Sequence, residues 1–387
     1  MKKILVITNG NIGDFVMASS ALRLLRQGEP SAEISLIASI KIKPFIEKLN
    51  FADAVLYTDF SFARTILRQR ADQILWFVKN YFRLKSANFD TCIFLDHSRF
   101  LAKAIALIGI KSLVGPSTWW CGDNIKNPNI KMLTHIADLP PNSDNFHMSQ
   151  RYQTIIRIYL KTSNLAMPIL PQTDDDLKNE TSRILSRKKK FAITISWRGD
   201  DIKGNKRIYP VKYLIKIIQE LSANFDIDFY LLGIQNSFKG AQEIISACRN
   251  LSITNLCGRT KLMHLKPIFE QTDLLISVDT GIIHIAAATN VNIIGLYGPI
   301  LYNSLPMSHR AQILYVKQPC SPCHYSRTVL KIPCPYGGKP KCLSDITPQM
   351  VIEAAEKQLA AGSLKRLPIT PKSIANVNCC HLNAEMV

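Results

Sequence analysis

The order of apolar and polar residues alternates between short strand-like runs and longer helix-like segments along most of the chain. Apolar runs of buried-strand length predict strands at residues 3–8, 33–38, 54–57, 91–95, 191–196, 229–232, 274–278 and 292–296. Segments with helical spacing lie between these runs, for example at 15–27 and 100–107. Because strands that alternate with helices form parallel sheets, we expect an α/β fold.

The alternation is interrupted between residues 168 and 190. Two prolines, an acidic group at 174–176 and a lysine run at 188–190 give this segment the composition of a linker, part of which can form a helix. We therefore predict two consecutive α/β domains that face each other across a ligand-binding cleft. Their expected bounds are 1–170 and 191–346, with the linker at 171–190.

The pattern predicts one more helix near the end of the chain. Thr347 is suited to an N-cap and Pro348 to the first helical position, so we expect a helix over 347–360. The residues after it, 361–387, are polar and dotted with prolines. We expect them to form a disordered tail.

The composition is that of a globular protein with acidic partners. Hydrophobic residues make up 47% of the 387, enough for two cores, and no apolar run approaches the roughly 18 residues that span a bilayer. The net charge of +19 indicates a phosphorylated substrate, anionic lipid or nucleic acid as partner, and no nucleic-acid-binding motif favours the last. The first residues resemble a strand more than a signal peptide, so we expect a cytoplasmic protein.

A polar group follows the predicted strand at 274–278. Asp279, Thr280 and Gly281 stand where a helix is expected to begin, and His284 comes about one helical turn later. Free backbone N–H groups and the positive end of a helix dipole meet at such a junction, which suits a phosphate. An ordinary helix cap would account for one of these polar residues, but not for all four.

A second loop of interest follows the first predicted strand. Gly10 and Gly13 allow a tight turn, and Asp14 stands where the next helix begins. The third glycine of a dinucleotide-binding loop is missing. Asp14 is either a helix-capping residue or a general base aimed at a ligand, since open α/β sheets bind ligands at the carboxyl ends of their strands.

Together the two loops resemble those of the glycosyltransferase family 9 heptosyltransferases, which transfer a heptose from ADP-heptose to the inner core of bacterial lipopolysaccharide. The resemblance extends over about residues 1–360. The motifs that carry it are Gly13-Asp14 with residues 18–22, Asp279-Thr280-Gly281-x-x-His284-x-Ala286-Ala287-Ala288, and residues 293–299.

The resemblance implies a GT-B fold, with two Rossmann-like domains, and an inverting, metal-independent transfer without a cofactor. Asp14, in the domain on the acceptor side, falls on the family's catalytic base, which would deprotonate the acceptor hydroxyl. Asp279 falls on a residue that contacts the donor sugar. Thr280, Gly281 and His284 would hold the diphosphate or stabilise the leaving group. The implied partners are ADP-heptose and a phosphorylated glycolipid at the anionic inner face of the inner membrane.

The resemblance also implies a cation on the donor diphosphate, shortly before the first helix of the second domain. Counting back from Pro210 places Arg207 on the family's lysine, whereas Lys206 fits if one residue is inserted. Either side chain can neutralise a phosphate, and the two can share the task.

The sequence departs from the family after Gly233. Many members carry an acidic residue there that can bind the ribose of the nucleotide, and this chain has Gln235 and Asn236 instead. The same family with another nucleotide sugar or acceptor is therefore one alternative. A nucleotide-sugar epimerase of the same fold and a nucleotide-sugar-binding protein without activity are two others, although the presence of both Asp14 and Asp279 argues against the last.

Two further features stand apart from the catalytic motifs. Cys320, Cys323, Cys334 and Cys342 could supply four thiolates to a structural zinc ion or a redox pair, but the second spacing is looser than that of a zinc ribbon. Residues 62–85 mix basic with apolar and aromatic side chains. They predict either a helix that lies on an anionic membrane or an ordinary domain helix with a solvated face.

Overall fold

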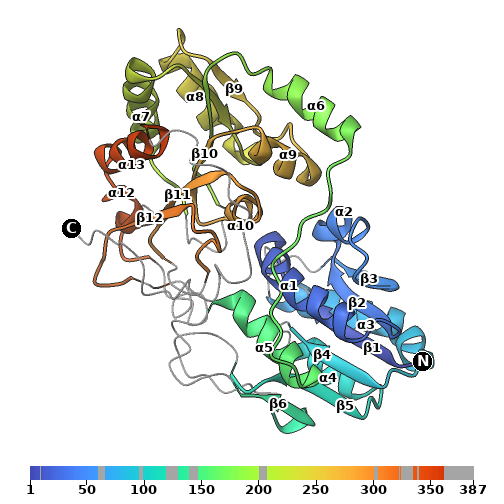
Figure 1. Cartoon of the computed structure of the whole chain (residues 1–387). Coiled ribbons are helices and arrows are strands. Elements are labelled where there is room, and N and C mark those ends of the chain that lie inside the picture. The colour runs from blue at the N-terminus through green and yellow to red at the C-terminus, as the bar shows by residue number, and fades with distance from the viewer. Residues whose placement is uncertain are drawn as a thin grey trace. The chain divides into compact units, whose positions relative to one another are not determined.

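The structure is a computed structural model of the 387-residue chain (Figure 1). The residues that it describes are 1–8, 10–59, 66–95, 99–118, 130–138, 147–199, 207–299, 304–321, 323, 334–337 and 340–360. The tail predicted at 361–387 lies outside them. The chain divides into two compact units, Met1–Pro171 and Gln172–Val387.

The first unit holds a six-stranded sheet. Its strands are β1 (Lys3–Thr8), β2 (Glu33–Ser39), β3 (Ala54–Thr58), β4 (Thr91–Phe94), β5 (Ser112–Pro116) and β6 (His135–Ala137). Its helices are α1 (Ile12–Gly28), α2 (Lys43–Ile46), α3 (Ile66–Ser86), α4 (Arg99–Ala106) and α5 (Met148–Leu160). Short 3-10 helices occupy Ile40–Ile42 and Ile130–Met132.

The second unit holds another six-stranded sheet. Its strands are β7 (Phe191–Ser196), β8 (Ile227–Leu231), β9 (Ile253–Asn255), β10 (Leu274–Val278), β11 (Asn292–Tyr297) and β12 (Ala311–Tyr315). Its helices are α6 (Asp175–Leu185), α7 (Val211–Asn224), α8 (Phe238–Ala247), α9 (Leu265–Glu270), α10 (Gly281–Ala287), α12 (Lys341–Ser344) and α13 (Pro348–Ala360). Short 3-10 helices lie at Gln235–Ser237 and Leu262–His264.

Both sheets are parallel and have the same strand order. The first runs β3-β2-β1-β4-β5-β6, and the second, counted in the same direction, runs β9-β8-β7-β10-β11-β12. In each sheet the chain begins in the middle, builds one half and then crosses to build the other, which is a doubly wound α/β topology. The predicted α/β fold class is confirmed.

All eight predicted strands are present, with bounds that differ by at most two residues at an end. β5, β6, β9 and β12 were not predicted. Three of these are outermost strands of three to five residues, and β5 carries a glycine and a proline that are rare inside strands. The segment expected as a linker contains α6, capped by the Asp174 carboxylate and packed against α9 of the second unit. Within the described residues, no helix is long and apolar enough to cross a membrane.

The cores follow from the burial of the central strands on both faces. Residues 4–8 of β1 and all five residues of β8 and β10 are buried, and apart from Asp228 in β8 these strands are mostly apolar. In the second unit α7, α8 and α13 cover one face of the sheet through residues such as Leu214, Ala241 and Ala355. The Tyr209 hydroxyl donates to the Ile346 carbonyl and ties the chain before α7 to the segment before α13.

Aspartates fix the amino-terminal edge of both sheets in the same way. Asp90 precedes β4, donates its N–H to the Lys3 carbonyl and accepts the Lys3 N–H at 2.7 Å. Asp273 precedes β10 and makes the same pair of bonds with Ala192, at 2.8 and 2.9 Å. Asp53 repeats the pattern with Ile34 in front of β3. These carboxylates satisfy strand N–H groups that lie outside the ladder.

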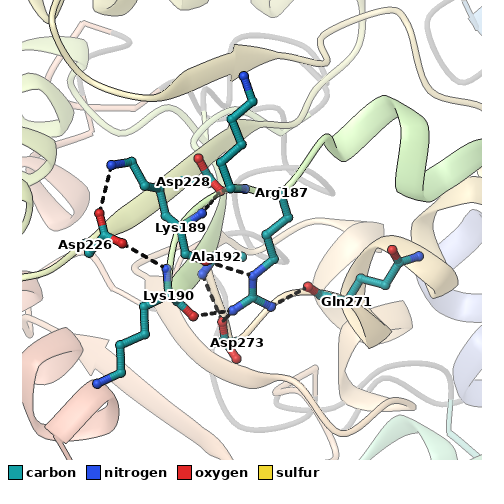
Figure 2. A network of polar contacts seen from close by, with 9 residues as sticks. Arg187, Lys189, Lys190, Ala192, Asp226, Asp228, Gln271 and Asp273 are labelled. Atoms are coloured by element: carbon teal, nitrogen blue, oxygen red, sulfur yellow. Dashed lines mark hydrogen bonds and ion pairs between the residues drawn. The ribbon is translucent and has the colours of Figure 1, made fainter.

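In the second unit this edge is extended into a network (Figure 2). The Arg187 guanidinium lies 2.8 Å from an oxygen of Asp273 and also donates to the Gln271 carbonyl. Asp228 accepts the backbone N–H groups of Lys188 and Lys189. The lysine run before β7 is therefore held in place at the edge opposite to the carboxyl ends of the strands.

Candidate functional site at the carboxyl ends of the strands

The topology singles out one place in each sheet. Doubly wound sheets bind ligands outside the carboxyl ends of their strands, where the strand order reverses. In the second unit that place lies between β7 and β10, which pair through Ser196 and Ser277 at their carboxyl ends. The predicted polar group from Asp279 to His284 directly follows β10, so it lies at this switch point (Figure 1).

An ion pair joins the two sides of the switch point. Arg207 Nη1 lies 2.9 Å from Asp279 Oδ2, and the two side chains are only 15% and 6% exposed. Arg207 is held by its backbone, because the Gly199 N–H donates to its carbonyl after β7. Separate ligand contacts were expected for Arg207 and Asp279, and their pairing with each other was not foreseen from the sequence. Lys206 lies outside the described residues.

Two buried hydroxyls at the same place have no hydrogen-bond partner within the described part of the chain. They are Thr280 Oγ1, at the start of α10, and Ser196 Oγ, at the end of β7. Thr280 is the N-cap residue of α10 by position, but its side chain makes no capping bond. Buried polar atoms are rarely left unpaired, so these two hydroxyls mark this place as unusual within the described part of the chain.

Gly199 makes this arrangement possible. A Cβ at this position would lie 3.2 Å from Arg207 Nε and 3.3 Å from Thr280 Cγ2. The three residues therefore meet, and the space beside the ion pair is kept free of a side chain. Gly281 is the first residue of α10 and is half-buried.

His284 lies on the buried side of α10. Burial lowers the pKa of its imidazole below the ordinary value, the nearby Asp279 carboxylate opposes this change, and Arg207 reinforces it. The ring is therefore neutral at pH 7. It can offer one N–H donor to a ligand, but it does not add a second positive charge beside Arg207.

The His284 pKa has a consequence for stability. The imidazole has a lower pKa in the folded protein than in the unfolded chain, where it is 6.5. Such a group stabilises the folded state above pH 6.5, and this contribution is lost as the pH falls through the pKa of the folded state. We expect the free energy of unfolding to fall below pH 6.5, by about 1.4 kcal/mol for each unit between the two pKa values. In His284→Gln the fall should be smaller, as measured by urea unfolding on both sides of that pH. Parallel pH profiles for the wild type and the variant would contradict this, and His135→Gln, at an exposed position, is the control.

Gln235 and Asn236, which stand where the sequence analysis expected an acidic residue, follow the end of β8. Gln235 lies in the 3-10 helix that follows β8, and a Cβ on Gly258 would come within 2.2 Å of its Oε1. Gly258 has φ +71°, a conformation that favours glycine. The Gln235 amide occupies the space that a side chain at position 258 would fill. Gln235 and Asn236 are both exposed.

In the first unit, Asp14 follows β1 at the corresponding edge. It is the third residue of α1, and its Oδ2 accepts the Asn11 N–H at 2.8 Å. Asn11, and not Asp14 as the capping interpretation expected, is therefore the N-cap residue, and Asp14 caps the helix from its third position. Asp14 is part-exposed and lies at the edge where this sheet would bind a ligand. Gly13 is buried in the first turn of the helix. A Cβ on Gly10 would lie 2.4 Å from that of Asp14, so Gly10 has to be a glycine for Asp14 to hold this position.

The four cysteines lie near one another, beside the turn after β11. Burial raises the pKa of Cys342 to about 12, and the neighbouring thiols of Cys323, Cys320 and Cys334 add to the rise. A Cβ on Gly298 would meet Cys342 Sγ at 2.6 Å, and the Cys323 N–H donates to the Pro299 carbonyl. All four are free thiols, and among the described residues no three His, Cys, Asp or Glu side chains are placed to hold a metal ion.

The residues that β7 contributes to the site were not predicted. Ser196 is the last residue of β7, a strand that the pattern did predict, and Gly199 follows it by three residues beside β10. The signal was a serine at the end of that strand with a glycine three residues on. This serine and glycine become candidate site residues once their strand is paired with the strand before Asp279.

Fold and site together define a two-domain α/β protein with a buried ion pair and a candidate ligand site at the switch point of its second sheet. Residues 165–332, which include the whole of that site, match the family model described as glycosyltransferase family 9 (heptosyltransferase). This region of the chain is thus similar to glycosyltransferase family 9.

Known relatives are similar to the chain at low identity. The chain is 23% identical over 366 residues to lipopolysaccharide heptosyltransferase 2 of Escherichia coli, an alignment that covers 91% of this chain and 97% of the relative. It is 25% identical over 169 residues to lipooligosaccharide heptosyltransferase 2 of Campylobacter jejuni, and that alignment covers 42% of this chain and about half, 49%, of that relative.

A solved structure shows the same fold. The structure of E. coli ADP-heptose LPS heptosyltransferase II matches with a TM-score of 0.69 at 20% identity, over 93% of this chain and 99% of that one. The predicted GT-B type of fold is confirmed by this likeness.

Proposed function

We propose that this protein is an inverting, metal-independent heptosyltransferase that moves a heptose from ADP-heptose to the inner core of lipopolysaccharide. The observation that carries the proposal is the Arg207–Asp279 pair at the switch point, within the segment that matches the family model. The relatives named above are heptosyltransferases of lipopolysaccharide and lipooligosaccharide, which supports the choice of sugar and acceptor.

In this proposal the second unit binds the donor. Arg207 carries a positive charge that a diphosphate needs, and Asp279 holds the guanidinium in position. The Thr280 hydroxyl, the N–H groups at the start of α10 and the neutral His284 supply further donors. These groups stabilise the negative charge that collects on the leaving diphosphate as the sugar departs.

Asp14 is the proposed base. Its carboxylate takes the proton of the acceptor hydroxyl, whose oxygen bonds to the anomeric carbon while the bond from that carbon to the diphosphate oxygen breaks. One displacement of this kind inverts the anomeric configuration. The charge that a metal ion carries in other glycosyl transfers would here be supplied by Arg207 and by hydrogen-bond donors.

The proposal is tested by ligand-dependent stability and by product analysis. Because a bound ligand stabilises the folded state more the further its concentration exceeds Kd, ADP-heptose and ADP should raise the melting temperature more than UDP- and GDP-sugars do. With a heptose-deficient core glycolipid, transfer should proceed in EDTA and give a product with inverted configuration. A stronger response to another nucleotide would assign a different donor. Conversion of the free nucleotide sugar without acceptor would identify an epimerase.

A further inference from the structure

Helix α3 of the first unit has two apolar faces, of which only one is covered. Phe77 and Leu84 are buried in the core beside Leu5, Ile7 and Leu56. The opposite face carries Ile74, Leu75, Val78 and Phe82, which are 51%, 70%, 62% and 80% exposed. Residues 75, 78 and 82 follow one another at intervals of three and four, so they form a continuous stripe along the helix.

The outer stripe cannot turn inward. The Trp76 indole N–H donates to the Tyr57 carbonyl at the end of β3, at 2.8 Å, and so fixes the rotation of the helix on the sheet. Tyr81 and Phe77, which both pack in the same core, form an edge-to-face pair. The apolar outer stripe therefore stays in water unless another surface covers it. Large exposed apolar patches of this kind mark interaction sites.

The charged residues beside the stripe indicate which kind of surface covers it. Lys79 and Arg83 lie along one side of the stripe and Lys85 along the other, all of them exposed. Asp72, one turn before Leu75, is the only acid within the described residues 71–86 of α3. A second copy of this helix would bring like charges together, whereas an anionic bilayer accepts apolar side chains below its headgroups and lysines and arginines among them.

We propose that the outer face of α3, made of Ile74, Leu75, Val78 and Phe82 with Lys79, Arg83 and Lys85 at its sides, docks the protein on an anionic lipid surface. The apolar stripe enters the boundary between headgroups and acyl chains, and the cations contact lipid phosphates. The purpose of this docking rests on the proposed function, because a glycolipid acceptor is presented on such a lipid surface. The binding itself needs neither donor nor acceptor.

The test is co-sedimentation of the full chain with phosphatidylcholine vesicles, with and without phosphatidylglycerol. We expect binding only to the anionic vesicles, and weaker binding as salt shortens the Debye length from about 10 Å to about 3 Å. Leu75→Ser with Phe82→Ser should lower binding by at least about tenfold, because two exposed side chains lose their apolar contact with lipid. Lys79→Gln with Arg83→Gln should lower it about fivefold for each charge and reduce its salt dependence.

Matched controls lie outside this face. Leu165→Ser and Lys216→Gln remove an exposed apolar residue and an exposed cation elsewhere, and they should leave binding unchanged. All variants should keep the melting temperature and the nucleotide-sugar response, so loss of docking is separable from failure of the proposed activity. Equal binding to neutral vesicles, or binding unaffected by the α3 variants, would overturn the proposal. So would a dimer in sedimentation equilibrium that Phe82→Ser dissociates, because a second copy would then cover the stripe.

Discussion

Replacement of Asp14 by asparagine is expected to lower kcat for sugar transfer by about 10²- to 10⁴-fold, the usual contribution of a general base. The asparagine side chain would keep an oxygen that can accept the Asn11 N–H, so the start of α1 should stay capped. The amide cannot take up a proton, however, and donor affinity should change little because the donor residues lie in the other unit. The measurement is steady-state transfer together with calorimetric donor binding.

Two further variants separate chemistry from structure at this position. Gly10→Ala keeps the carboxylate but places a Cβ 2.4 Å from that of Asp14, so it should also lower kcat by displacing the base. Asp176→Asn removes an exposed carboxylate from the first turn of α6 and should have no effect on transfer. If Asp14→Asn lost donor binding and turnover equally, Asp14 would have a structural role only.

Arg207→Gln is expected to weaken donor binding by about 10- to 100-fold, since a hydrogen bond to a charged group contributes about 1.5–3 kcal/mol. ADP alone should lose a similar factor, because the proposed contact is to the diphosphate and not to the sugar. Isothermal titration with ADP and with the nucleotide sugar measures both. Lys216→Gln, which removes an exposed cation from α7, is the matched control.

The ion pair gives this prediction a second readout. Without Arg207, the Asp279 carboxylate stays buried and loses its charge partner, so Arg207→Gln should also lower the melting temperature of the unliganded protein. Arg207→Gln with Asp279→Asn should recover part of that stability but none of the donor affinity. A variant that lost stability while binding ADP normally would show that the pair only supports the fold.

The sequence pattern predicted the central strands well because they are buried on both faces, and a buried strand is apolar along its whole length. β12 escaped prediction since all five of its residues are only half-buried, and an outer strand of this kind carries little signal. The pattern did not predict the doubly wound strand order, because which strands pair depends on contacts far apart in the sequence.

Of the candidate site, the sequence predicted the residues that lie close together in the chain but not the contacts between distant ones. Asp279 to His284 were found because they follow one another on one strand-to-helix turn. The pairing of Arg207 with Asp279 spans 72 positions and could not be predicted from spacing. The neutral state of His284 depends on burial, which a sequence does not show. For α3, the pattern left a membrane helix and a domain helix as alternatives, and the structure shows a core face and an exposed apolar face on the same helix.

The shared strand order of the two units allows the positions of Asp14 and Asp279 to be compared. If one unit is superposed on the other strand by strand, β1 coincides with β7 and β4 with β10. Asp14 then falls beside the residues that follow β7, whereas Asp279 falls beside the end of β4. The two aspartates therefore do not occupy equivalent positions in the two units. The repeated scaffold thus carries its two candidate aspartates at different strands, Asp14 after the first strand of its unit and Asp279 after the fourth.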